Sequence, residues 1–163
     1  MSGAKPGRET AADGGRASQA EDVVALTPGW AVKTAALVGG AGGLLIAVAG
    51  LQLLIGVTFV SPAFRAIPFA HLALGAASIL FAFKTFELRQ WAAIGGVAVS
   101  SAIAIGGGTW LVFAVSSGIL SLLGMIVPFT AVGGAVFSGL AIGPCRRAGA
   151  ARARMFEGMQ ELY

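Results

Sequence analysis

The chain has 163 residues, of which 56% are hydrophobic and 11% are charged, and its formal net charge is +4. Soluble domains carry about 25% charged residues, because polar side chains must cover their surface. The composition therefore excludes an ordinary water-soluble fold, and the length suits a single domain.

The few charged residues are separated from long apolar runs. Between Thr34 and Phe83 the only charged side chain is Arg65, and residues 90–145 contain none. A run of about 20 apolar residues crosses a bilayer core as a helix. The sequence predicts an all-α integral membrane protein with four transmembrane helices in two hairpins. Because no basic stripe with interleaved aromatic residues is present, nucleic acid is not an expected partner.

Residues 1–26 combine glycine, alanine, serine and charges of both signs without a periodic apolar face. Such a segment cannot bury enough apolar surface to become ordered, so it is predicted to be a disordered tail. A cleaved secretory signal is not expected, because the first apolar run is too long. Acidic residues in the tail, including Glu9 and Asp13, disfavour an organelle transit peptide.

The transmembrane bundle is predicted over residues 27–144. Thr27-Pro28 and Ser61-Pro62 each place an N-cap hydroxyl before a proline at the first helical position, which is typical of a helix start. Pro144 is expected to end the last helix. The four helices are predicted at about residues 31–60, 62–88, 91–115 and 119–143.

The two hairpins show a weak internal similarity. Ile67-Pro68-Phe69 corresponds to Val127-Pro128-Phe129 later in the chain, and residues 36–40 resemble residues 92–96. Parallel repeats of a two-helix unit would produce this pattern. Low-complexity segments also match by chance, so duplication and coincidence both stay open. Pro68 and Pro128 are each expected to lie inside a helix and to kink it.

Residues 145–163 are predicted to form a short cytoplasmic amphipathic helix, lying on the inner leaflet or docked on a partner. Its arginines would lie near anionic headgroups. Cys145 is the only cysteine, so an internal disulfide is excluded. It is either a lipidated or reactive thiol, or a small apolar side chain that fills space.

The distribution of basic residues predicts the orientation. Arg65 alone lies on the side of the first and third loops, and every other basic residue lies on the opposite side. The positive-inside rule then places both termini in the cytoplasm. Trp30 and Trp91 are expected at that interface and Trp110 at the other. A bacterial inner (plasma) membrane is predicted. The residues on the cytoplasmic side are Lys5, Arg8, Arg16, Lys33, Lys84, Arg89, Arg146, Arg147, Arg152 and Arg154.

Small residues recur at four-residue spacing on three of the predicted helices. Such stripes let helix backbones approach closely in lipid. They serve either packing within the bundle or an interface, so a homo-oligomer or a larger membrane complex is the expected assembly within the lipid bilayer. The predicted helix-packing positions are Gly39, Gly43, Gly96, Ser100, Gly108, Gly139 and Gly143.

Gln52, His71 and Thr109 are predicted at similar depth near the outer side and form a candidate polar site. An intramembrane histidine is a functional candidate. The structural alternative is a Gln52–His71 hydrogen bond between two helices. The lone histidine lacks companion ligands, so no metal site and no cofactor are predicted.

No paired carboxylates and no catalytic triad can be assembled from this composition, so the chain is not expected to be an enzyme. The leading hypothesis is a non-catalytic accessory or scaffold subunit that packs through its small-residue helix faces. The first alternative is a small oligomeric channel or transporter with its polar site around Gln52, His71 and Thr109. A second alternative is a membrane protein that binds a lipid or a quinone-like molecule.

Overall fold

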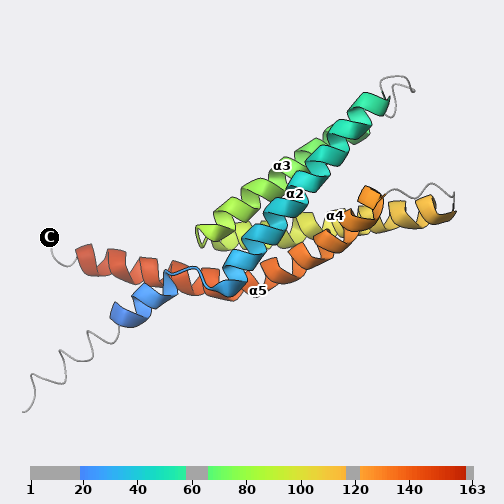
Figure 1. Ribbon diagram of the computed structural model, residues 1–163. Helices are drawn as coiled ribbons and strands as arrows, with labels where there is room; N and C mark the ends of the chain where they lie inside the picture. The colour runs from blue at the N-terminus through green and yellow to red at the C-terminus, as the bar shows by residue number, and fades with distance from the viewer. Residues whose placement is uncertain (1–18, 58–65, 117–121, 161–163) are drawn as a thin grey trace, which may run out of the picture.

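The computed structural model describes residues 19–57, 66–116 and 122–160, which are helical apart from turns at 26–29 and 87–89. A short helical segment over residues 19–25 precedes the first long helix. The all-α class is confirmed, and so are four helices that are long and apolar enough to cross a membrane. The long helices are α2 (Trp30–Val57), α3 (Ala66–Phe86), α4 (Gln90–Ser116) and α5 (Leu122–Gln160) (Figure 1).

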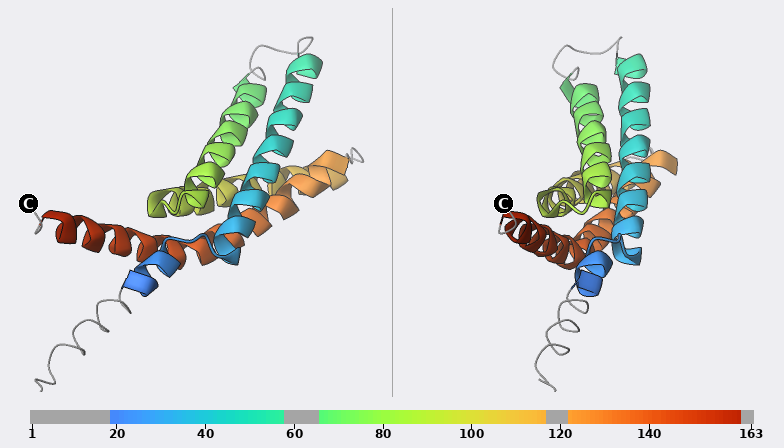
Figure 2. Two further views of the ribbon diagram at one scale, coloured as in Figure 1. Left: turned by 60° about the vertical axis from the view of Figure 1, so that its left-hand side comes forward. Right: turned by 90° about the vertical axis from the view of Figure 1, so that its left-hand side faces the viewer.

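The helices pack as two hairpins, α2 with α3 and α4 with α5. The hairpins meet at one end, where α2 also packs on α5, and their other ends point apart (Figures 1 and 2). We call the end where they meet the base. In the most apolar 18-residue stretch of each of these helices, only 22–28% of the residues are buried inside the molecule. Most of the apolar surface therefore faces outward, as expected for helices surrounded by lipid.

The lengths of α2 and α4 fit a tilted arrangement. These helices have 28 and 27 residues. At 1.5 Å per residue they are about 42 and 40 Å long, whereas a bilayer hydrocarbon core is about 30 Å thick. A helix of this length tilts or extends into the headgroup region. The diverging hairpins are compatible with such tilts (Figure 2).

Glycines bring α2 and α3 into backbone contact. A Cβ at Gly75 would lie 2.7 Å from the carbonyl oxygen of Gly43 and 2.9 Å from the amide nitrogen of Ala47. A Cβ at Gly50 would lie 3.1 Å from the carbonyl oxygen of Pro68. Side chains larger than hydrogen have no room at these positions. Close backbone approach maximises van der Waals contact, which holds helices together in lipid.

Serine–glycine pairs perform the equivalent role between α4 and α5. A Cβ at Gly96 would lie 2.9 Å from Ser138 Oγ, and a Cβ at Gly134 would lie 2.8 Å from Ser100 Oγ. Ser100 and Ser138 are both buried. Each helix therefore places a small hydroxyl side chain over a glycine of the other helix.

The last helix does not end where the sequence predicted. α5 continues through Pro144 to Gln160, so the break expected at residue 143 is absent and residues 145–160 extend the fourth apolar helix. Proline removes one helical hydrogen bond. The residues after it are nevertheless held by tertiary contacts, because Cys145, Ala148 and Ala151 are fully buried. Packing overrides the local signal.

The other two prolines differ in position. Pro68 lies in the first turn of α3, where its missing N–H removes no helical hydrogen bond, so the predicted kink there is not needed. Pro128 lies further inside α5. The predicted N-cap role of Thr27 is also not observed, because its hydroxyl donates a hydrogen bond to the carbonyl of Val23, 3.1 Å away. The predicted start at Ser61-Pro62 lies outside the described residues.

The segment immediately before α2 corrects the prediction of a disordered tail in part. Residues 19–25 are helical, and the Asp22 carboxylate pairs with the Arg154 guanidinium near the end of α5. Asp22 is only 7% exposed. This ion pair orders the segment, and the sequence around Asp22 does not predict it because the partner is distant in the chain. Residues 1–18 lie outside the described part of the chain.

We expect the replacement Gly75→Leu to destabilise the α2–α3 hairpin by at least about 1–3 kcal/mol, because the new side chain collides with backbone atoms of α2. Thermal unfolding in detergent measures the effect. Ala41→Leu is the matched control, since Ala41 is exposed on α2 and accepts the same bulk. Equal stability of the two variants would contradict the close approach of the helices.

Candidate functional site

The three residues of the predicted polar site bond within their own helices or not at all. The His71 Nδ1–H donates to the carbonyl of Ile67, 2.9 Å away, and the Thr109 hydroxyl donates to the carbonyl of Ile105 at the same distance. Gln52 is exposed on α2. Within the described residues, no hydrogen bond joins any two of Gln52, His71 and Thr109. The predicted Gln52–His71 hydrogen bond is therefore not formed.

His71 instead takes part in the helix packing. A Cβ at Gly50 would lie 2.9 Å from the Cβ of His71, so the base of the histidine side chain rests against the α2 backbone. The ring is half-buried. Because the histidine occupies this space, residue 50 has no room for a side chain larger than that of glycine.

A small, largely apolar pocket lies between the two hairpins. Ser78 of α3, Ser100 of α4 and Thr130 of α5 contribute to its lining, and its volume is about 10 Å³. That volume is about the minimum for one water molecule. Thr130 already donates to backbone carbonyls of its own helix. The pocket is too small for an organic substrate.

The predicted packing positions divide into an inner and an outer group. Gly39, Gly43, Gly96 and Ser100 contact the neighbouring helix of their hairpin. Gly139 is exposed and lies 4.0 Å from Val97 through its Cβ position, and no neighbouring atom of the described residues lies within 4 Å of the Cβ positions of Gly108 and Gly143. The outer group therefore leaves space on the surface of α4 and α5. Sequence reasoning missed one further outer stripe, which consists of Ala98, Ala102 and Gly106, all exposed on α4.

The turn between α3 and α4 has an unusual conformation. Leu88 has a φ of 59°, a left-handed conformation usually taken by glycine. The Leu88 N–H donates to the Thr85 carbonyl at 2.9 Å, and the Arg89 N–H donates to the Lys84 carbonyl at 3.1 Å. These two bonds form a Schellman motif that ends α3. A leucine in this conformation costs about 1–3 kcal/mol, so the surrounding structure must hold it in place.

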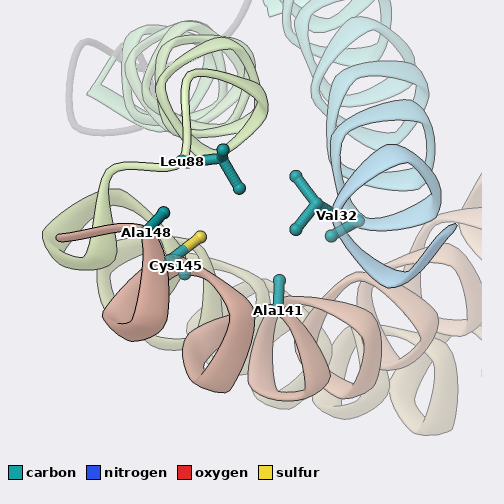
Figure 3. Close-up of a cluster of buried hydrophobic side chains, with 7 residues drawn as sticks. Val32, Leu88, Ala141, Cys145 and Ala148 are labelled. Atoms are coloured by element: carbon teal, nitrogen blue, oxygen red, sulfur yellow. The ribbon is translucent and has the colours of Figure 1, made fainter. Parts of the chain in front are cut away.

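A cluster of buried apolar side chains at the base keeps Leu88 in this conformation. Leu88 is 3% exposed, and its side chain points toward Val32 at the start of α2 (Figure 3). Ala141, Cys145 and Ala148 of α5 complete one side of the cluster (Figure 3). Burying a leucine side chain contributes roughly 1.5–3 kcal/mol, enough to offset the backbone strain.

Polar contacts from α5 reinforce the same turn. One Arg152 Nη donates to the Glu87 carbonyl at 2.9 Å and the other to the Leu88 carbonyl at 3.5 Å. The Cys145 thiol faces the Thr85 carbonyl, with 3.9 Å between sulfur and oxygen. Carbonyl groups at a helix C-terminus lack helical partners and carry partial negative charge, which a cation stabilises. We call Leu88, Arg152 and the cluster around them the basal junction.

The contacts recorded at the basal junction are apolar packing and hydrogen bonds from Arg152. The described residues contain no group of three histidine, cysteine or acidic side chains that could hold a metal ion. Cys145 is fully buried among apolar neighbours, a structural setting rather than a reactive one. The length and apolar composition of the four long helices indicate a multi-pass membrane protein. Comparison with known protein families, with curated proteins and with solved structures found no match to this chain.

Replacing Leu88 by alanine should lower the stability by about 2–5 kcal/mol, because it empties the basal junction and keeps the strained backbone. Thermal or denaturant unfolding in detergent measures the change. Leu80→Ala on the exposed side of α3 provides the control and should have little effect. A similar loss in both variants would contradict the role assigned to Leu88.

Proposed function

We propose that the protein is a non-catalytic accessory or scaffold subunit, which associates with copies of itself or with a larger membrane protein. The observation that carries the proposal is the outer set of small residues on α4 and α5. Gly106 and Gly143 have open space at their Cβ positions, and Ala98 and Ala102 are exposed on the same side of α4 as Gly106. These positions offer shallow helix surfaces to another helix.

The interior of the bundle supplies the physical reason. Gly43 and Gly75 let two helix backbones touch, and α4 and α5 use serine–glycine pairs for the same purpose. In lipid, apolar side chains gain little by leaving lipid for protein, so close backbone approach is the main source of helix association. An outer helix face of the same composition suits the same kind of contact.

The structure gives less support to a transport function. A transport path around Gln52, His71 and Thr109 needs polar groups directed at a common space. The bonds of His71 and Thr109 instead run to carbonyls of their own helices. None of the three residues lines the small pocket between the hairpins. A packing role therefore accounts for more of the observed contacts.

We also propose an orientation in the membrane, which rests on the positions of the basic residues. We place the base on the cytoplasmic side of a bacterial inner membrane, with both termini inside. Lys33 lies in the first turn of α2, Lys84 in the last turn of α3 and Arg89 directly before α4. Arg152 of α5 binds the turn between α3 and α4. Such clustering of basic residues beside membrane-crossing helices is typical of the cytoplasmic face.

We expect the protein purified in mild detergent to run as a homo-oligomer or with a membrane partner. Gly106→Leu and Gly143→Leu should each reduce this association, because a leucine holds the approaching helix away. Native mass spectrometry and light scattering report the assembled mass. Both variants should fold, since no atom lies within 4 Å of either Cβ position.

The control for this experiment is Ala73→Leu, which adds bulk on the exposed side of α3. It should leave the assembled mass unchanged. A wild-type protein that is a monodisperse monomer without a partner would refute the scaffold proposal. Equal loss of association in all three variants would refute the assignment of the interface to α4 and α5.

Single introduced cysteines test the orientation. Cys145 is 0% exposed, so the wild-type protein should react little with a membrane-impermeant maleimide. Ser61→Cys should be labelled on intact cells, whereas Ser18→Cys should be labelled only after the membrane is opened. Labelling of both positions from the same side would overturn the proposed topology.

A further inference from the structure

A groove lies at the base beside the turn that joins α3 to α4. It opens between the start of α4 and the part of α5 beyond Pro144, and its volume is about 420 Å³. Its helical walls come from α4 and α5, which form one hairpin, and Leu88 and Arg89 belong to the turn that connects this hairpin to α3. The residues that line it are Leu88, Arg89, Gln90, Trp91, Ile94, Cys145, Gly149 and Arg152.

The polar part of the groove is cationic. Arg89 and Arg152 line it, and none of the acidic residues that the structure describes does. The Arg89 side chain is exposed and makes no hydrogen bond or ion pair within the described residues. The Arg152 guanidinium caps two backbone carbonyls, yet it carries five N–H donors and retains others. Glu87, close in sequence, is already paired with Lys84 at 2.9 Å.

The other wall of the groove is apolar and exposed. Trp91 and Ile94 are 54% and 50% exposed and lie about one turn apart at the start of α4. Tryptophan prefers the headgroup level of a membrane, with its ring toward the acyl chains. The groove therefore presents two guanidinium groups at one level and an apolar surface next to them.

We propose that this groove binds the phosphate of an anionic glycerophospholipid from the surrounding leaflet. Arg89 and Arg152 bind the phosphate oxygens, and an acyl chain covers Trp91 and Ile94. A free phosphate ion would satisfy the arginines and leave the apolar wall bare, whereas a lipid satisfies both. Because the groove lies beside the turn that connects the two hairpins, the bound lipid also stabilises the base.

The test uses the full-length protein in nanodiscs of equimolar phosphatidylglycerol and phosphatidylcholine. Native mass spectrometry then measures which lipid stays bound. We expect phosphatidylglycerol to be retained in preference to phosphatidylcholine. Arg89→Gln removes one charge-assisted contact and should weaken phosphatidylglycerol binding about tenfold. Phosphatidylglycerol should also raise the melting temperature of the wild type more than that of this variant.

A second variant tests the shape of the groove without changing its charge. Gly149 is exposed and has no atom within 4 Å of its Cβ position, so Gly149→Leu should fold normally and fill the groove. It should reduce phosphatidylglycerol binding as Arg89→Gln does. Arg147→Gln is the matched control, since Arg147 is exposed on α5 and does not line the groove. It should retain wild-type binding.

Three outcomes would overturn the proposal. The first is equal retention of the two lipids, and the second is equal weakening by Arg89→Gln and Arg147→Gln, which indicates attraction to a basic surface in general. The third is displacement of phosphatidylglycerol by inorganic phosphate alone, which indicates a free-anion site. Because none of these readouts depends on oligomerisation, failure here leaves the scaffold proposal standing, and failure of the scaffold proposal leaves this one standing.

Discussion

Close contact between helix backbones is the constraint on which this fold depends. Most residues in the apolar stretch of each helix face outward, so burial of apolar surface distinguishes poorly between correct and incorrect helix pairs. The fit between the surfaces of two helices must select the correct pair instead. Gly43 and Gly75 fix the register of the first hairpin, and the serine–glycine pairs of α4 and α5 fix that of the second. The outward-facing glycines, such as Gly106 and Gly143, are not needed for packing within the hairpins and are free to contact other molecules.

The basal junction solves a different problem, which is how two hairpins with diverging ends stay joined. The strained Leu88 turn alone would be a weak point. Its side chain is buried against α2 and α5, and Arg152 binds the carbonyls that the end of α3 leaves unpaired. Backbone strain, apolar packing and a cation are thus concentrated at one place. The lipid groove adjoins this junction and shares Leu88 and Arg152 with it.

The apolar runs were sufficient to predict four helices in hairpins, because a bilayer demands long apolar segments whatever packs against them. Local signals failed where tertiary contacts decide. Pro144 reads as a helix end, yet the buried alanines after it keep α5 continuous. The sequence predicts Gln52 and His71 at similar depth in the membrane. Depth alone does not determine the direction in which a side chain leaves its helix, and His71 bonds to its own helix instead. Arg152 binds backbone carbonyls, which have no sequence signature.

The Asp22–Arg154 pair has a consequence for the order of assembly. Its partners are 132 positions apart, with α2, α3, α4 and most of α5 between them. Translation makes Asp22 before any of the long helices and Arg154 only after α2, α3 and α4, so Asp22 has to wait for its partner. No partly built hairpin can form this contact. Its formation therefore requires that α5 has been made and has docked beside the segment that precedes α2.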